Sequence, residues 1–201
     1  MPLPDEYLFY PHRQHGLDNP RHDWDPADRR APIALSSRIK SIATIIVPVE
    51  FFPLAVFPKA TTWMSPARNE SYRTLDLLAE AGFEICLNWE ADQRPLPFKT
   101  NSKPIWSLPH YGELGDFKLL IDRSQSEEDW QAQITETAAY HIALHEKEGA
   151  SAWAFTLTPY VLGQPFRMQA VKQTLDALTA MDGLALMTAG ESCAAFQEVM
   201  S

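Results

Sequence analysis

Two groups of histidines have the residue types of a metal site. His141 and His145 lie four positions apart, and on a helix this spacing puts both imidazoles on one face, where they can bind a metal ion. No third ligand is apparent near this pair, so partly buried or surface histidines are the alternative. The spacings of the second group match no known metal cluster, and its segment can instead dock on the body or on another subunit. Its members are His12, His15, His22, Asp23, Asp25 and Asp28. We therefore expect no metal centre and no cofactor.

Glu50 is a candidate for acid–base chemistry because of what precedes it. Residues 42–49, IATIIVPV, form a β-branched apolar run that predicts a strand buried on both faces, as in a parallel sheet. A carboxylate directly after this run lies at a strand end. It is there either a base or a substrate-contacting group, or else an acid exposed to solvent or paired with an arginine.

Other kinds of chemistry have little support in the sequence. There is no G-x-S-x-G motif, and Cys86 lies inside an apolar run that predicts a small buried side chain. The eight glycines are well spread, so no loop is built to cradle phosphate. Cys86 and Cys193 have no redox or metal spacing, and a reducing compartment is the simplest interpretation.

The elements that would position these residues alternate between strand and helix. The segment 127–148 is the best-marked helix: Ser126 caps it, Gly149 ends it, and an apolar stripe follows helical spacing. The stripe consists of Trp130, Ile134, Ala138 and Ile142. Apolar runs before and after this helix and the next one predict βα units in a parallel sheet or barrel. Residues 1–35 have no sustained period, so we expect an N-terminal arm followed by one α/β domain over 36–201.

Composition and charge exclude several classes of partner. The net charge of −9 repels phosphate backbones, so nucleic acid is not an expected partner. No apolar stretch reaches the length of about 18 residues that a membrane span needs, and the N-terminus MPLPDEYLFYPHR lacks the apolar run of a signal peptide. We therefore expect a cytoplasmic protein without a membrane partner.

The run from Trp63 to Ala189 resembles the C-terminal half of the polysaccharide deacetylase family, most closely its allantoinase-like branch. WMSPARNESYRTLDLLAEAGFEICLNWEADQRPLP is similar to the family's Trp-x-x-Pro turn, helix, Gly-Phe strand start and Asp-x-x-Pro loop. IWSLPHYGELGDFKLL is similar to its Leu-Pro-Tyr strand and Asp turn, and FTLTPYVLGQPFRMQAVKQTLDAL to its Leu-His-Pro segment and following helix. LALMTAGE resembles the closing strand, while YLFYPHRQ and IIVPVEFFP resemble the entry loop and first strand.

This resemblance implies a truncated, distorted (β/α) barrel with its site at the C-terminal ends of the strands. The family hydrolyses N-acetyl groups or cyclic amides, with a carboxylate base and often a divalent metal. Its H-x-x-x-H metal motif lies between the first strand and the Trp-x-x-Pro turn. Here only Phe51 to Thr62 fill that interval, without a histidine, and the family's catalytic histidine maps onto Thr158.

The resemblance also implies which residues form the site. Glu50 and Asp92 are the candidate catalytic carboxylates, although Asp92 can equally form a turn before Pro95. Six further residues map near the pocket mouth and can bind a planar or sugar ring, or serve loop packing. These substrate-binding candidates are Trp63, Arg68, Trp106, His110, Thr158 and Tyr160.

Three functions remain open at this point. The first is a non-catalytic or partner-dependent subunit that assembles with itself or with a full-length deacetylase-like chain. The second is an active, metal-independent amidohydrolase that acts on a cyclic amide or N-acetyl substrate through Glu50 and Asp92. The third is a small-molecule or glycan binding module that retains the pocket and has lost the chemistry.

Overall fold

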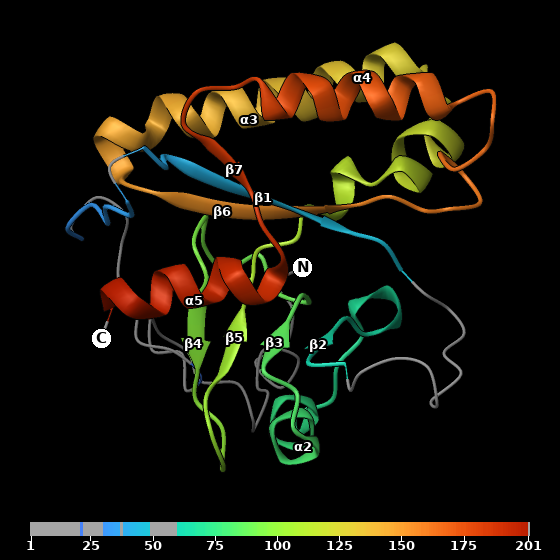
Figure 1. The fold of residues 1–201 in the computed structure, drawn as a ribbon. Helices are drawn as coiled ribbons and strands as arrows, with labels where there is room; N and C mark the ends of the chain where they lie inside the picture. The colour runs from blue at the N-terminus through green and yellow to red at the C-terminus, as the bar shows by residue number, and fades with distance from the viewer. Residues whose placement is uncertain (1–20, 22–29, 37, 49–59, 201) are drawn as a thin grey trace, which may run out of the picture.

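The structure is a computed structural model that describes residues 21, 30–36, 38–48 and 60–200. One of its two sheets has three parallel strands in the order β6-β1-β7 (Figure 1). These strands are β1 (Ser41–Ile46), β6 (Ser151–Thr156) and β7 (Leu184–Leu186). The first described strand therefore lies between the last two. The apolar run predicted as a buried strand forms β1 only as far as Ile46, and Val47 beyond it is exposed.

The second sheet has four strands in the order β2-β3-β5-β4. Three of them are parallel, and β4 pairs antiparallel with β5 at one edge. They are β2 (Thr62–Trp63), β3 (Ile85–Cys86), β4 (Leu96–Phe98) and β5 (Ile105–Ser107). Parallel pairing agrees with the alternation of strands and helices along the chain, while the antiparallel β4 was not predicted.

A single bridge between His110 and Ala154 joins the two sheets. The amide of Ala154 donates to the carbonyl of Pro109 at 2.8 Å, and the amide of Tyr111 donates to the carbonyl of Ala154 at 2.8 Å. The chain after β5 therefore continues as a short partner of β6. The described strands form two sheets held together at this point, and no closed barrel is seen among them.

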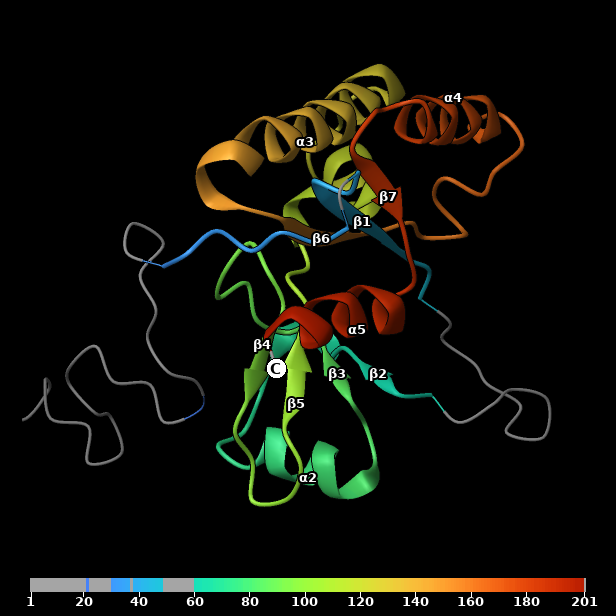
Figure 2. The ribbon, with the colours of Figure 1, turned by 60° about the vertical axis from the view of Figure 1, so that its left-hand side comes forward.

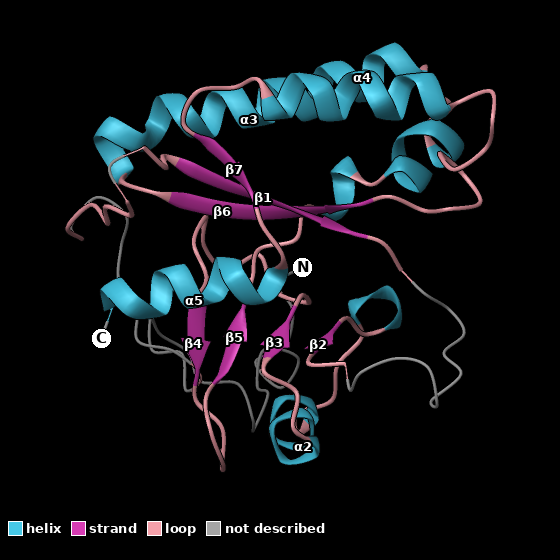
Figure 3. Ribbon diagram, in the orientation of Figure 1, coloured by secondary structure: helices cyan, strands magenta, loops and turns pink. Residues whose placement is uncertain are grey.

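Helices cover the outer faces of both sheets and the space between them (Figures 1 to 3). α3 and α4 lie side by side over the three-stranded sheet, and α2 lies against the four-stranded sheet. The α-helices among the described residues are α2 (Thr74–Ala81), α3 (Glu127–Glu148), α4 (Met168–Thr179) and α5 (Ala189–Met200). Shorter helical segments are the 3-10 turns Pro66–Arg68 and Gly112–Leu114 and the π-helix Phe117–Asp122.

α3 begins and ends at the residues that the sequence predicts. Ser126 accepts a hydrogen bond from the amide of Asp129, and the Asp129 side chain accepts one from the amide of Ser126, which forms a capping box. Gly149 ends the helix with φ 81° and ψ −169°, a conformation open to glycine. Trp130, Ile134 and Ala138 are buried as predicted.

β6 is buried on both faces because its side chains alternate in size. Trp153 and Phe155 point toward α3 and α4, where they join the core cluster that contains Trp130 and Ile134. Ala152 and Ala154 face the other side. The small side chains leave room for the inner core between the two sheets, so the period of two along this strand separates two cores.

α5 fills the space between the two sheets. Phe196 and Cys193 are buried in the same cluster as Ile42 of β1 and Ile85 of β3. The hydroxyls of Thr44 and Ser192 form a buried hydrogen bond of 2.8 Å between β1 and α5. In Figures 1 and 2 the helix lies between the sheets, so a helix of this chain covers apolar faces that a shortened barrel would leave open.

The described residues of the N-terminal arm contact the body. The carbonyl of Ile33 accepts a hydrogen bond from the amide of Ala150, and Ile33 forms a parallel bridge with Gly149. Arg21 forms a bidentate ion pair with Asp76 of α2, with both N–O distances 3.0 Å. The pKa of the Asp76 carboxyl is lowered by this hydrogen-bonded guanidinium.

The contact at Gly149 predicts a selective loss of stability. A Cβ on Gly149 would lie 2.4 Å from the Ile33 amide nitrogen, and the positive φ adds backbone strain. We expect Gly149→Ala to lower the free energy of unfolding by about 2 kcal/mol or more. The matched control is Gly190→Ala in α5, where an added Cβ meets no atom within 4 Å. Equal urea midpoints for the two variants would contradict this assignment.

The position of α5 predicts a second pair of variants. Phe196 is fully buried, whereas Val199 on the same helix is 47% exposed. We expect Phe196→Ala to reduce the free energy of unfolding by about 3 kcal/mol or more because it opens a cavity between the sheets. Val199→Ala should change it by about 0.5 kcal/mol or less. Thermal or urea unfolding measures both, and a small effect of Phe196→Ala would show that α5 does not close the core.

Candidate functional site

A cavity of about 380 Å³ lies beyond the C-terminal ends of β2, β5 and β6. Its walls are the turn after β2, the segment after β5 with the start of the π-helix, and the end of β6. Parallel α/β sheets bind ligands at this edge. The side chains and glycine that line it include Ser65, Arg68, His110, Gly112, Asp116, Phe117, Lys118, Thr156 and Thr158.

His110 is the buried imidazole of this cavity. Its Nδ1 lies 3.0 Å from Nη2 of Arg68, and its Nε2 lies 2.7 Å from Oγ1 of Thr156. A guanidinium can only donate, so Nδ1 accepts and the ring hydrogen is on Nε2, which donates to Thr156. Burial, with the positive charge of Arg68, lowers the pKa of His110 to about 4. The imidazole is therefore neutral with both nitrogens engaged.

Arg68 is held in place by an unusual backbone and a glycine. Ala67 and Arg68 have φ values of 50° and 55°, a left-handed conformation that non-glycine residues rarely adopt. A Cβ on Gly112 would lie 2.6 Å from Nη2 of Arg68, so the guanidinium occupies space that any side chain at position 112 would fill. Nη1 donates to Glu90 at 2.5 Å, and Nη2 also donates to the carbonyl of His110. Backbone strain of this kind is concentrated at functional sites.

Asp116 ties the π-helix to the loop after β6. It is fully buried, and its Oδ1 accepts from the amide of Phe117 at 2.8 Å. Its Oδ2 accepts from the amide of Thr158 at 2.7 Å. Two amide hydrogens stabilise the buried carboxylate, and through them the side chain positions Thr158 in the cavity wall.

The structure brings some of the predicted site residues together and separates others. Arg68, His110 and Thr158 line the cavity. Tyr160 is 57% exposed and packs edge-on against Phe117 at 6.3 Å between ring centroids, next to the cavity. The two tryptophans lie elsewhere.

Trp63 and Trp106 are placed by the four-stranded sheet outside the lining of the cavity. Trp63 packs edge-on against Phe83 at 5.2 Å and donates through Nε1 to the hydroxyl of Ser65 at 2.8 Å. Trp106 in β5 packs against the inner core. Trp63 therefore acts on the cavity only through Ser65.

The two predicted catalytic carboxylates do not meet in the described structure. Glu50 lies outside the described residues. β1, the strand that leads toward it, is paired with β6 so that Ile46 lies opposite Thr156. Asp92 does not line the cavity. Its carboxylate forms ion pairs with the buried guanidiniums of Arg30 and Arg94, and the distance to Nε of Arg94 is 3.5 Å. Its Oδ1 also accepts from the amide of Gln93, so its observed contacts are structural.

The sequence prediction named three of the lining residues and missed the others, among them Ser65, Gly112, Asp116 and Thr156. The sequence did contain a signal for Asp116, because this residue is the aspartate of the Asp turn in the segment IWSLPHYGELGDFKLL. Thr156 ends β6 two residues before Thr158, so both side chains reach the same side of the strand end. Ser65 and Gly112 have no comparable signal, because their roles depend on Trp63 and Arg68 from other parts of the chain.

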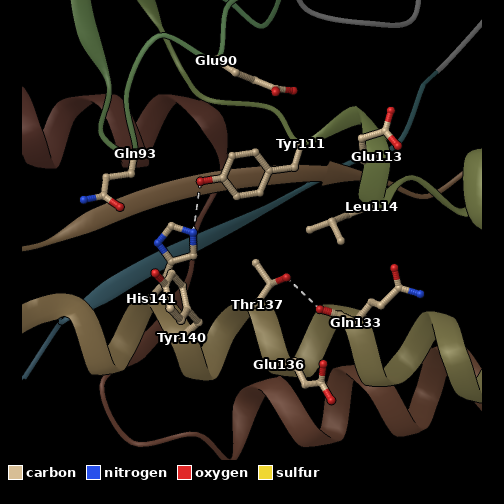
Figure 4. Close-up of a pocket in the computed structure, with 10 residues that line it drawn as sticks. All are labelled: Glu90, Gln93, Tyr111, Glu113, Leu114, Gln133, Glu136, Thr137, Tyr140 and His141. Atoms are coloured by element: carbon tan, nitrogen blue, oxygen red, sulfur yellow. Dashed lines mark hydrogen bonds between the residues drawn. The ribbon is translucent and has the colours of Figure 1, made fainter.

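A second cavity, of about 650 Å³, lies between the loop after β3, the segment after His110 and α3 (Figure 4). His141 forms part of its floor. Its Nε2 lies 3.1 Å from the Tyr111 hydroxyl and its Nδ1 lies 3.0 Å from the Ser151 hydroxyl. Burial lowers the pKa of His141 to about 4 and raises that of Tyr111 to about 12.

The predicted histidine pair is thus divided by its surroundings. His141 is buried and stacks on Trp153 with 5.8 Å between ring centroids, while both its ring nitrogens face hydroxyls. His145, one turn further along, does not line either cavity. Within the described ranges no three His, Cys, Asp or Glu side chains are arranged to hold a metal ion. The N-terminal histidine and aspartate group lies outside those ranges.

Among the described residues, no helix combines the length with the apolar character that crossing a membrane requires.

The two buried imidazoles predict how stability depends on pH. The unfolded chain binds a proton near pH 6.5 at each histidine, and the folded chain only near pH 4. The contribution of each neutral imidazole to the free energy of unfolding is therefore fully present above pH 6.5. It is lost as the pH decreases toward 4, by up to about 3 kcal/mol for each histidine. Urea unfolding at intervals between pH 7 and 4.5 measures the loss, and His110→Gln should make the profile less steep. An NMR titration should show neutral His110 with its hydrogen on Nε2, and a pKa of 6 or more would contradict the assignment.

Comparisons with known proteins support the fold. No family model matches the sequence, and no curated protein matches it significantly. Among solved structures, a protein of Mycobacterium smegmatis described as a polysaccharide deacetylase has a TM-score of 0.58 and 20% identity, covering 70% of this chain and 49% of that one. The allantoinase Puue has a TM-score of 0.52 and 15% identity, covering 61% and 41%. A protein of Pseudomonas aeruginosa described as a polysaccharide deacetylase has a TM-score of 0.52 and 14% identity, and the coverage is again 61% of this chain and 41% of that one.

The chain thus spans about half or less of the length of these similar structures. At such identities the likeness concerns the fold alone. The predicted resemblance is confirmed at that level: this chain has a mixed α/β fold with parallel sheets, similar to part of the polysaccharide deacetylase and allantoinase structures.

Proposed function

We propose that this chain is a non-catalytic, deacetylase-like protein that binds a small polar molecule in the cavity around His110. The observation that carries the proposal is the hydrogen-bonded state of His110. Its Nδ1 lone pair is occupied by Arg68, and its Nε2 hydrogen is directed at Thr156. An amide hydrolase of this fold needs a group that removes a proton from water, and this imidazole has no free lone pair for it.

Arg68 also prevents His110 from activating Thr156. In a serine-type triad a carboxylate accepts the Nδ1 hydrogen, which leaves Nε2 free to take the hydroxyl proton. Here a cation stands beside Nδ1 and imposes the opposite tautomer, so Nε2 donates to the hydroxyl instead of accepting from it. A protonated His110 beside the permanent charge of Arg68 is disfavoured, in agreement with its lowered pKa.

The remaining polar groups support binding better than turnover. Thr158 stands where the resemblance places the family's proton carrier, and a hydroxyl does not exchange protons near neutral pH as an imidazole does. Asp116 has both oxygens bonded to backbone amides. A cavity of about 380 Å³ is nevertheless within the range of small-molecule sites, and the backbone of Arg68 in its wall has a φ of 55°.

The proposal extends to assembly. A homo-oligomer, or a complex with a full-length deacetylase-like subunit, would supply the proton-transfer group that the cavity lacks. If the chain instead functions by itself, it should neither copurify with a partner nor self-associate.

A second candidate, the metal-independent amidohydrolase, rests on Glu50. β1, the strand that leads toward it, ends beside Thr156 of the cavity, with the Ile46 carbonyl accepting from the Leu157 amide at 3.0 Å. Asp92 supports this candidate less, because Arg30 and Arg94 already hold its carboxylate.

An activity assay separates these functions. We expect the purified chain to release no acetate from an N-acetylated glycan and to leave the ring of hydantoin closed, because no described side chain of the cavity is free to accept a proton. Turnover that Glu50→Gln abolishes, while Asp182→Asn on the loop before β7 does not, would replace the proposal by the hydrolase. Light scattering tests assembly, and a stable monomer that binds no coexpressed deacetylase-like chain would contradict the subunit role.

A further inference from the structure

In the first cavity, the cavity around His110, the described hydrogen-bond donors outnumber the acceptors that face them. The guanidinium of Arg68 has five N–H groups. One is directed at Glu90, one at Nδ1 of His110 and one at the carbonyl of His110. Two N–H groups of Arg68 therefore have no acceptor among the described residues, and the side chain is 29% exposed, so a ligand that enters the cavity can reach them.

The hydroxyls of Ser65 and Thr156 in the same cavity also have hydrogens without a described acceptor. Oγ of Ser65 accepts from Nε1 of Trp63 and from Nδ2 of Asn88, both at 2.8 Å. Oγ1 of Thr156 accepts from His110. Each oxygen thus receives a hydrogen, and the described part of the chain offers no acceptor for the hydrogen that each hydroxyl carries.

The charged groups around the cavity define the ligand further. Lys118 adds a second cation to the lining, although its Nζ is 3.2 Å from Asp122. The carboxylate of Asp116 lies in the same wall, where its two oxygens are used by backbone amides. A negative charge in the wall opposes a dianion, while the unmatched donors favour a single negative charge with two acceptor oxygens.

We propose that the cavity binds the carboxylate group of a small monoanionic organic acid, with Arg68 and the hydroxyls of Ser65 and Thr156 donating to its two oxygens. Phe117 lines the cavity and packs against Tyr160, and these rings contact the carbon skeleton of the ligand. The inference rests on the proposed binding function and names its ligand class. Acids with a flat or aromatic skeleton suit this wall best.

Gly112 makes the role of Arg68 separately testable. Its missing side chain leaves the space that Nη2 of Arg68 occupies. An alanine there would push the flexible end of Arg68 away from His110 without a clash with backbone atoms. Gly112→Ala is thus expected to impair anion binding while the rest of the fold is kept, and Arg68→Gln removes the charge directly.

The experiment is a calorimetric titration of the whole chain with three probes of similar shape: benzoate, neutral benzamide and dianionic phenyl phosphate. We expect benzoate to bind at least about tenfold more tightly than either of the others, because a charge-assisted hydrogen bond contributes about 1.5 kcal/mol or more. Arg68→Gln and Gly112→Ala should each weaken benzoate binding by about tenfold or more. Lys172→Gln on α4 removes the same charge far from the cavity and should leave binding unchanged.

The outcomes separate this inference from the proposed function. Benzamide binding as tightly as benzoate, or phenyl phosphate binding more tightly, would overturn the carboxylate assignment and leave a non-catalytic binding protein. Benzoate binding that survives both Arg68→Gln and Gly112→Ala would overturn the assigned site, as would the absence of binding by all three probes. Hydrolysis of an N-acetylated or cyclic amide substrate by the same preparation would instead overturn the proposed function.

Discussion

Two hydrogen bonds between Ala154 and the chain after β5 set the arrangement of the edge where both cavities lie. They join the two sheets, and they make residues 109–111 extended, so that successive side chains point to opposite sides. His110 consequently enters the cavity with Arg68, while Tyr111 enters the other cavity with His141. Both sites therefore depend on one short stretch of backbone pairing between strands that are far apart in the chain.

The chemistry of the first cavity is decided by which charge stands beside a buried imidazole. A carboxylate at Nδ1 would raise the proton affinity of His110 and free its Nε2 for catalysis. Arg68 has the opposite effect, since it occupies Nδ1 and keeps the ring neutral. The same guanidinium, together with two hydroxyls that already accept hydrogen bonds, makes the cavity a donor-rich site. The proposed loss of acid–base function and the proposed affinity for acceptor groups would thus have a common physical cause.

The described elements bury their core without a closed barrel. α5 inserts Phe196 between the two sheets, and β1 lies between β6 and β7, so that the inner faces of both sheets share one cluster. The large side chains of β6 meet α3 and α4 on the other side. Packing of this kind needs no closed barrel, because each face of the three-stranded sheet has its own cover.

Local residue patterns determined much of this protein in advance. The cap at Ser126, the apolar stripe and Gly149 specify α3 at both ends, the β-branched run specifies β1, and the resembling segments specify the deacetylase-like fold. Only the tertiary structure decided that Arg68, His110 and Thr158 share a cavity that excludes Trp63 and Trp106, and that Asp92 is held by Arg30 and Arg94. The reason is physical: helix ends and buried strands follow from interactions between near neighbours in the chain. The tautomer of His110 and the free hydrogens of Ser65 and Thr156 follow from contacts between segments that meet only when the sheets pack.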